Sequence, residues 1–344
     1  MRAQPHILVP YSHQLSSNSS TSELIYCSYS FKYGATPIRR EIDLDITLYA
    51  SFSLPMYRKD EDCWIKVFGY GRGSKICVEG SLKCYGPPCS DELFIKYATG
   101  LWIDVEKNLE DLGGEARQVA EDVLEKFYCL SISASPWDKL EVLAAAFLSR
   151  NTDYHVNTVR WTRTLLHEIS SLNSRNANSV RKAVLLTYGK YRSYQILQLS
   201  EVIGEVLSAL QADSAKDVEN TRKLLIKIKY LGPKVVDSFI LHSGLDSARA
   251  PIDVHYMRFL KKYGLLKYEA AYPQKSYCAR YYCTTCPRAQ RCIYAYAART
   301  FKGLNGLIQT ASYVSDKLKV ESCRDLDKFG IKLLLKKITA GFRI

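Results

Sequence analysis

Residues 228–244 read IKYLGPKVVDSFILHSG and contain the end of one helix, a tight turn and the start of another. The apolar periodicity of the first helix stops near Ile228, and the turn covers residues 230–232. Pro233 stands where a new helix would begin, since its fixed φ suits the first helical position. Two helices joined by so short a turn present backbone N–H groups at the start of the second helix, and such a helix end binds phosphate.

Two charged residues near this hairpin are candidates for chemistry. Lys234 lies in the first turn of the second helix, where the helix dipole disfavours a positive charge; burial would add to this and favour a neutral, nucleophilic amine. The residues alone favour the simpler interpretation, a lysine that neutralises phosphate or faces solvent. Asp253 is placed to cap the helix that follows it, and a carboxylate held so rigidly can also stabilise positive charge on a reacting sugar carbon. His255, in the first turn of that helix, is interpreted as structural.

A third feature is a cluster of cysteines with the spacing Cys278-x4-Cys283-x2-Cys286-x5-Cys292. Four thiolates this close in sequence can hold zinc or an iron–sulfur cluster, and the spacing alone does not separate the two. Four ordinary cysteines are the less favoured alternative. Around them stand basic residues that suit contacts with phosphate or, alternatively, with solvent: Lys275, Arg280, Arg288, Arg291 and Arg299.

Composition narrows the class of protein further. The chain has 344 residues, 47% of them hydrophobic, which predicts two domains, or alternatively three, with a sizeable core. Its 48 basic and 35 acidic residues give a formal charge of +13, which favours a nucleic-acid partner over a membrane. No apolar run approaches the roughly 18 residues of a spanning helix. The N-terminus lacks the apolar core of a signal peptide, so we expect an intracellular protein, cytoplasmic or associated with the nucleoid. Eleven cysteines, an odd number, fit poorly with complete internal pairing.

The pattern of apolar and polar residues predicts a β-rich N-terminal unit followed by a mainly helical part. Residues 42–54, IDLDITLYASFSL, alternate as a strand would, and residues 69–75, GYGRGSK, predict a hairpin. The predicted divisions are a flexible tail over 1–22, an α+β domain over 23–130, a helical domain over 131–265 with the hairpin at 215–244, a cysteine loop over 266–300, and a helical extension over 301–344.

The motifs Gly232-Pro-Lys234-Val-Val-Asp and Pro251-Ile-Asp253-Val-His255 resemble the helix-hairpin-helix and Gly/Pro-Asp signature of the DNA glycosylase superfamily. The run GPKVVDSFIL…PIDVHYM is most similar to eukaryotic-type 8-oxoguanine DNA glycosylases, whereas the cysteine cluster resembles the [4Fe–4S] loop of endonuclease III. The likeness covers roughly residues 135–300. It implies a mainly α, helix-hairpin-helix glycosylase fold with an iron–sulfur loop and a small α+β N-terminal domain. It also favours a [4Fe–4S] cluster over zinc.

The resemblance also implies an activity: base-excision repair by a monomeric DNA glycosylase with AP lyase activity, acting on damaged, chiefly oxidised, bases in double-stranded DNA. The target base would be flipped out of the duplex. Lys234 would attack C1′ and form a Schiff base, and Asp253 would stabilise the charge that builds on the sugar. The residues expected to contact DNA are Arg150, Asn151, Lys229, Leu231, Gly232, Arg288 and Arg291.

Three departures from the family pattern stand out. Tyr230 occupies the place of the first hairpin glycine, the first cysteine gap is x4 rather than x6, and Arg150-Asn151 replaces the glutamine that enters the gap left by the flipped base. The alternatives are a monofunctional glycosylase for uracil, alkylated or mispaired bases, a helix-hairpin-helix protein that only binds DNA, and a zinc-stabilised RNA-binding protein.

Overall fold

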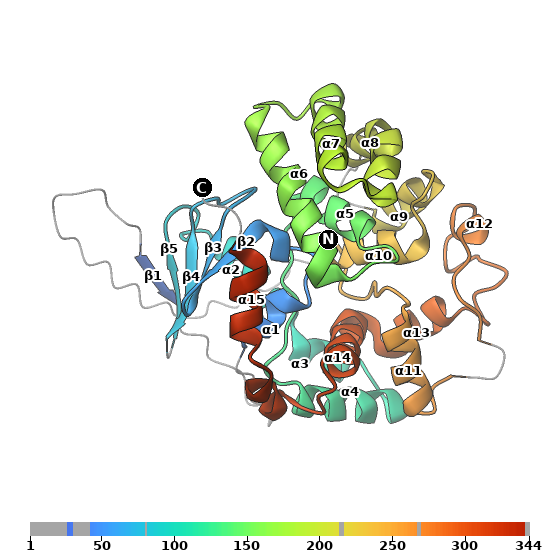
Figure 1. Ribbon diagram of the computed structural model, residues 1–344. Helices are drawn as coiled ribbons and strands as arrows, with labels where there is room; N and C mark the ends of the chain where they lie inside the picture. Colours follow the sequence, from blue (N-terminus) through green and yellow to red (C-terminus); the bar gives the residue numbers. More distant parts are fainter. Residues whose placement is uncertain (1–25, 30–41, 80, 213–216, 267–269, 341–344) are drawn as a thin grey trace, which may run out of the picture.

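The chain folds into a small sheet at one end of the molecule and two groups of helices beside it (Figure 1). The computed structural model describes residues 26–29, 42–79, 81–212, 217–266 and 270–340. The prediction of a mainly helical protein with a small α+β N-terminal part is confirmed. The tail predicted over 1–22 lies outside the described residues. Within the described ranges, no helix combines the length and apolarity needed to cross a membrane.

The sheet has five strands in the order β1-β5-β4-β3-β2, and each neighbouring pair is antiparallel. Their bounds are β1 Tyr26–Tyr29, β2 Tyr57–Asp60, β3 Cys63–Lys66, β4 Lys75–Glu79 and β5 Ser81–Tyr85. The hairpin predicted around 69–75 is present, because β3 and β4 pair across it with Trp64 opposite Ile76. Helix α2 (Glu92–Thr99) follows the sheet and brings the Phe94 ring to 5.5 Å from the ammonium of Lys66.

The strand predicted over 42–54 is wrong, because this segment contains the helix α1 (Leu44–Tyr49). The carboxylate of Asp43 accepts hydrogen bonds from the backbone N–H groups of Asp45 and Ile46, at 2.7 and 3.4 Å, and so caps the helix. All six helical residues are buried. The alternating apolar and polar residues therefore do not mark a buried and an exposed face, as they would in a half-buried strand.

The first helical group carries the predicted hairpin. Its members are α5 (Lys139–Leu148), α6 (Val159–Ser171), α7 (Ala177–Tyr191), α8 (Tyr194–Ala212), α9 (Val218–Lys227) and α10 (Pro233–His242). The sequence Ser135-Pro136 is typical of a helix start, with serine as the cap and proline at the first position, but α5 begins three residues later. The Ser135 hydroxyl instead donates to Asp138, which also accepts from the buried Lys66, and the helix begins after Asp138.

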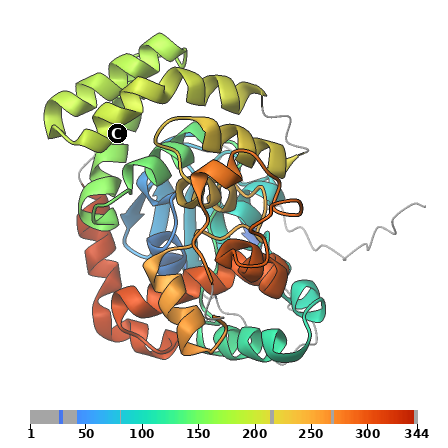
Figure 2. The ribbon, with the colours of Figure 1, turned by 90° about the vertical axis from the view of Figure 1, so that its right-hand side faces the viewer.

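The second helical group combines distant parts of the sequence. It contains α3 (Val105–Glu110), α4 (Gly114–Lys126), α11 (Val254–Lys262), α13 (Ile293–Phe301) and α14 (Asn305–Leu318). The figures place α3 and α4 beside α11, α13 and α14 (Figures 1 and 2). The last helix, α15 (Ile331–Thr339), returns to the sheet, where the Thr339 hydroxyl accepts from the backbone N–H of Lys59 at 3.1 Å. The C-terminal segment therefore contributes α14 to the second helical group and packs α15 against the sheet.

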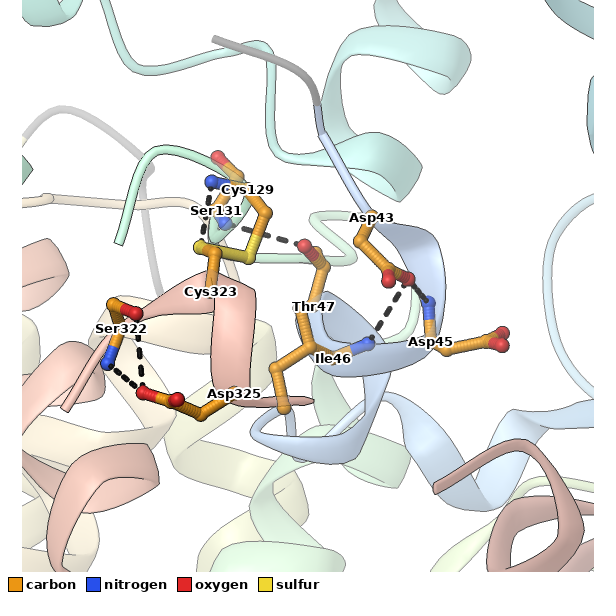
Figure 3. Close-up of a disulfide and its surroundings, with 9 residues drawn as sticks. All are labelled: Asp43, Asp45, Ile46, Thr47, Cys129, Ser131, Ser322, Cys323 and Asp325. Atoms are coloured by element: carbon orange, nitrogen blue, oxygen red, sulfur yellow. Dashed lines mark hydrogen bonds between the residues drawn. A yellow bond between two sulfur atoms is a disulfide. The ribbon is translucent and has the colours of Figure 1, made fainter. Parts of the chain in front are cut away.

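Three disulfides join cysteines outside the predicted cluster: Cys63–Cys77, Cys84–Cys89 and Cys129–Cys323. The last one links the segment after α4 to the segment between α14 and α15 (Figure 3). The backbone N–H of Cys129 also donates to the sulfur of Cys323, and the N–H of Ser131 donates to the Thr47 hydroxyl of α1 at 3.2 Å. The disulfide thus secures the C-terminal helices beside α1.

Removing this long-range disulfide should cost more stability than removing a short-range one. The Cys129–Cys323 bridge spans 194 residues and the Cys63–Cys77 bridge spans 14. Because the entropy of the unfolded chain depends on the length of the closed loop, Cys129→Ser/Cys323→Ser should lose about 2 kcal/mol more than Cys63→Ser/Cys77→Ser. Guanidinium unfolding of the two double variants measures the difference. Equal losses would contradict the expectation.

Two buried histidines should make the fold sensitive to mild acid. Burial lowers the pKa of both His155 and His242 from 6.5 to about 4. Because the folded-state pKa lies below the unfolded one, the unfolded chain binds the extra proton between about pH 4 and 6.5, and stability falls as pH is lowered through that window. Across the whole window, each histidine lowers the free energy of unfolding by about 3 kcal/mol. Unfolding at pH 4.5 and 7 checks this. His242→Gln should remove about half of the pH dependence, and the exposed control His167→Gln should leave it unchanged.

Candidate active site and cysteine centre

The predicted hairpin is present, with α9 and α10 joined by a short turn. Pro233 occupies the first turn of α10 as expected, and Gly232 is the residue before it. Tyr230, which replaces the expected first glycine, adopts φ of +65°. It therefore takes up the left-handed conformation that glycine would have there, at a cost of roughly 1–2 kcal/mol for a residue with a Cβ. The hairpin survives this substitution.

Contacts around the turn hold Tyr230 in this conformation. The Arg150 guanidinium donates to the Tyr230 carbonyl at 3.2 Å and lies 5.9 Å from its ring. The Tyr230 hydroxyl donates to Glu201 at 2.8 Å, and Lys229 pairs with the same carboxylate. The predicted DNA contact Arg150 also donates to the Phe147 carbonyl and to Gln198. Its guanidinium is thus bonded within the protein, where it braces the hairpin turn.

Replacing Tyr230 by two small residues should separate backbone strain from side-chain contacts. Tyr230→Gly and Tyr230→Ala both lose the hydrogen bond to Glu201, but only alanine keeps the cost of the left-handed conformation. The glycine variant should therefore be more stable than the alanine variant by about 1 kcal/mol, even though glycine is normally the less favourable residue. Denaturant unfolding measures this. An alanine variant as stable as the glycine variant would show that the turn relaxes.

Lys234 is the exposed residue of a helix that is otherwise buried. The neighbours of Lys234 on α10, from Val235 to His242, are all buried, and so is Pro233. Lys234 is thus exposed and not buried, in contrast to the burial considered from the sequence. The amine stands at the positive end of the helix dipole and is open to a ligand. No ion pair joins Lys234 to Asp253 in the described part of the chain.

Asp253 caps α11, as the sequence predicts, and its second oxygen is also held. One oxygen accepts from the backbone N–H of Tyr256 at 2.8 Å, and the other accepts from the side-chain amide of Gln309 at 3.1 Å. Asp253 is half-buried, whereas Gln309 is buried. Both carboxylate oxygens are therefore oriented by donors, which leaves the group rigid and acceptor-only when ionised.

Gln309 belongs to a row of α14 residues that the sequence reasoning missed. Tyr313 lies one turn further, with its ring 5.2 Å from the His255 ring, and Asp316 accepts from His255 at 2.6 Å. Hydrogen bonds from Lys319, His255 and Arg258 hold the pKa of Asp316 well below its usual range. The spacing 309, 313 and 316 is that of one helical face, and this periodicity was the signal available in the sequence.

The other predicted DNA contacts occupy different settings. Lys229, Arg288 and Arg291 are exposed, and the Arg288 guanidinium lies 4.9 Å from the Tyr277 ring. Asn151 is exposed and has φ of +50° at the end of α5. Leu231 is buried and its N–H donates to the Ile228 carbonyl, so this amide is already bonded within the turn. Gly232, half-buried, stands directly before α10.

The four cysteines of the loop line one pocket and form no disulfide. The pocket is also lined by Tyr281, Ala289, Tyr294 and Ala295. Figure 2 shows the loop in orange on the face turned to the viewer. The first cysteine ends α12 (Lys275–Cys278), and the last one directly precedes α13, which begins at Ile293. Among the residues with described positions, no three His, Cys, Asp or Glu side chains converge closely enough for one metal ion.

The loop is fastened to the hairpin from two sides. The Lys275 ammonium donates to the Ile228 carbonyl at the end of α9 at 2.5 Å. The guanidinium of Arg222 on α9 lies 3.9 Å from the sulfurs of Cys278 and Cys283. Burial raises the pKa of Cys283 to about 12, and the nearby Arg222 charge opposes that shift. Four thiols around one pocket next to a buried cation are a donor set that fits an anionic iron–sulfur cluster.

Comparison with known proteins places this geometry in a structural context. No family model matches the sequence. No curated protein matches it either. Among solved structures, MBOgg1 in complex with a low-affinity DNA ligand has a TM-score of 0.56 at 16% identity, over 86% of this chain and 99% of that one. A Clostridium acetobutylicum 8-oxoguanine glycosylase/lyase, in complex with double-stranded DNA containing cytosine opposite 8-oxoguanine, has a TM-score of 0.54 at 11% identity, over 81% and 93%. Its apo-form has a TM-score of 0.51 at 11% identity, over 79% and 92%.

The chain therefore shares the fold of these solved structures, in agreement with the fold that the sequence resemblance implied. The likeness extends beyond the roughly 135–300 stretch that carried it in the sequence. In this chain Lys234 and Asp253 stand at the starts of α10 and α11.

Proposed function

We propose that this protein is a base-excision DNA glycosylase with AP lyase activity, acting on oxidised bases in double-stranded DNA. The observation that carries the proposal is the position of Lys234, the one exposed side chain of α10, at the start of the second hairpin helix. A helix-hairpin-helix that only binds DNA has no need of Lys234 or of the oriented Asp253. The 8-oxoguanine glycosylase/lyase of similar fold supports the oxidised-base class.

In the proposed reaction Lys234 supplies the nucleophile. Its Nζ, once neutral, forms a bond to C1′ of the flipped nucleotide while the bond from C1′ to the base breaks and the base leaves. Loss of a proton from Nζ leaves an aminal at C1′. The C1′–O4′ bond then breaks as O4′ takes up a proton, which opens the sugar ring and gives the protonated Schiff base. Removal of a proton from C2′ then breaks the C3′–O bond and releases the 3′ phosphate by β-elimination. Asp253 stabilises the positive charge on the sugar as the base departs, and Gln309 keeps that carboxylate oriented.

DNA binding is proposed to use the hairpin and the cysteine loop together. The start of α10 offers backbone N–H groups to phosphate, next to the exposed Lys229. Arg288 and Arg291 extend the basic surface along the loop. The overall charge of +13 supports a polyanionic partner.

Cys278, Cys283, Cys286 and Cys292 are proposed to hold a [4Fe–4S] cluster, with zinc as the alternative. Thiols spread around a pocket suit a group of several irons better than a single ion, which needs all four sulfurs about 2.3 Å from one point. When bound, the cluster would supply a rigid core for the loop. The loop residues would then hold Arg288 and Arg291 in place for phosphate.

Borohydride trapping on a panel of duplexes tests the proposed reaction. The panel contains 8-oxoguanine, thymine glycol, uracil and an abasic site, and the proteins are wild type, Lys234→Ala and Lys227→Ala. Wild type should give a covalent adduct on a duplex with an oxidised base and on the abasic site. Lys234→Ala should reduce trapping by at least about 100-fold, because the amine that forms the Schiff base is gone.

Lys227→Ala is the matched control, because Lys227 is an exposed lysine in the last turn of α9. It should trap as well as wild type. Full strand nicking by Lys234→Ala would overturn the assigned nucleophile. Base release without an adduct would instead identify a monofunctional glycosylase, and DNA binding without release would identify a binding protein.

A further inference from the structure

Arg222 of α9 is buried, and its guanidinium contacts both α10 and the cysteine loop. Its side chain is 2% exposed. On one side its Nε and Nη2 donate to the two carboxylate oxygens of Asp237 on α10, at 2.5 and 3.1 Å. This paired geometry uses the planar fork of the guanidinium and makes Arg222 the link between the two hairpin helices.

The adjoining edge of the same guanidinium faces the cysteine pocket. Its Nη1 lies 3.9 Å from the sulfur of Cys283, and its Nη2 lies 3.9 Å from the sulfur of Cys278. The guanidinium also lies over the Tyr294 ring at 4.2 Å, and that ring lines the pocket. The Tyr294 hydroxyl in turn accepts from Arg249 at 3.0 Å. Two arginines therefore stand behind the cysteine centre.

This arrangement suits an anionic centre and cannot be reproduced by another residue type. Arginine offers five N–H donors in a fixed plane, so it can serve a carboxylate and two sulfurs together. A lysine ammonium in the same place is a single point of charge. Hydrogen bonds to the sulfurs that hold a metal stabilise it, and the loss of such an outer partner typically lowers metal affinity by about 10–100-fold.

We propose that Arg222 is a positioning residue of the cysteine centre, which donates to the sulfurs of Cys278 and Cys283 and joins that centre to α10 through Asp237. This inference rests on the proposed function in one respect, that the four cysteines hold a metal centre. Arg222 thereby connects the helix that bears Lys234 with the loop that bears Arg288 and Arg291.

The test compares metal release from the full-length protein under a chelator. The variants are Arg222→Lys and Arg222→Gln, with Arg280→Gln as the matched control. Arg280 is an exposed arginine between the first two cysteines of the loop, so its variant loses the same charge without losing a donor to sulfur. Arg222→Gln should release metal at least tenfold faster than wild type, Arg222→Lys should be intermediate, and Arg280→Gln should match wild type.

A second variant and a second readout keep the result decisive. If Arg222→Gln does not fold because Asp237 is left unpaired, Arg222→Gln/Asp237→Asn replaces the ion pair with two neutral amides. In an iron-loaded protein, loss of the donors should destabilise the reduced cluster, shifting the one-electron reduction equilibrium tenfold, or about 59 mV to lower potential. Release and potential equal to those of Arg280→Gln would overturn the inference.

Iron and zinc contents of the wild type separate this inference from the proposed function. A colourless zinc protein would overturn the [4Fe–4S] assignment, while the release comparison would still decide the role of Arg222. A protein that binds neither metal would overturn both. Absence of a trapped DNA adduct would bear on Lys234 alone, since metal release is measured without DNA.

Discussion

The burial of α10 on every side except at Lys234 is the constraint on which the rest of the site depends. Residues 235–242 are enclosed by neighbouring elements, and the far end of the helix is fixed by the bond from the Ser135 N–H to the His242 carbonyl. A helix packed at interior density cannot turn or slide without opening cavities. The position of Lys234 is therefore set by the core, and the amine stays available because it makes no structural bond of its own in the described residues.

The second candidate catalytic group depends on a different part of the chain. Asp253 is fixed locally by capping α11, but its free oxygen is oriented by Gln309 of α14. Helix α14 is kept close by its packing on α11 and by the bridge from Cys129 to Cys323 just beyond it. The two candidate residues are thus held by two independent supports, a buried helix and a disulfide-linked C-terminal segment.

Local features of this site could be predicted from the sequence, and long-range ones could not. The turn at Tyr230, Pro233 at the start of α10 and the Asp253 cap depend on residues within a few positions of one another, and all three are present. The Arg222–Asp237 pair and the Gln309–Asp253 bond depend on how helices meet in space. The strand predicted over 42–54 failed because periodicity alone does not reveal a segment buried on all sides.

The contribution of α14 has a consequence for biosynthesis. Gln309 lies 56 residues after its partner Asp253, and Cys323 lies 194 residues after Cys129. A chain still being translated can form the hairpin and α10 while α14 is within the ribosome, but it lacks the amide that orients Asp253. The order of the sequence therefore delays completion of the Asp253–Gln309 arrangement until synthesis has passed α14.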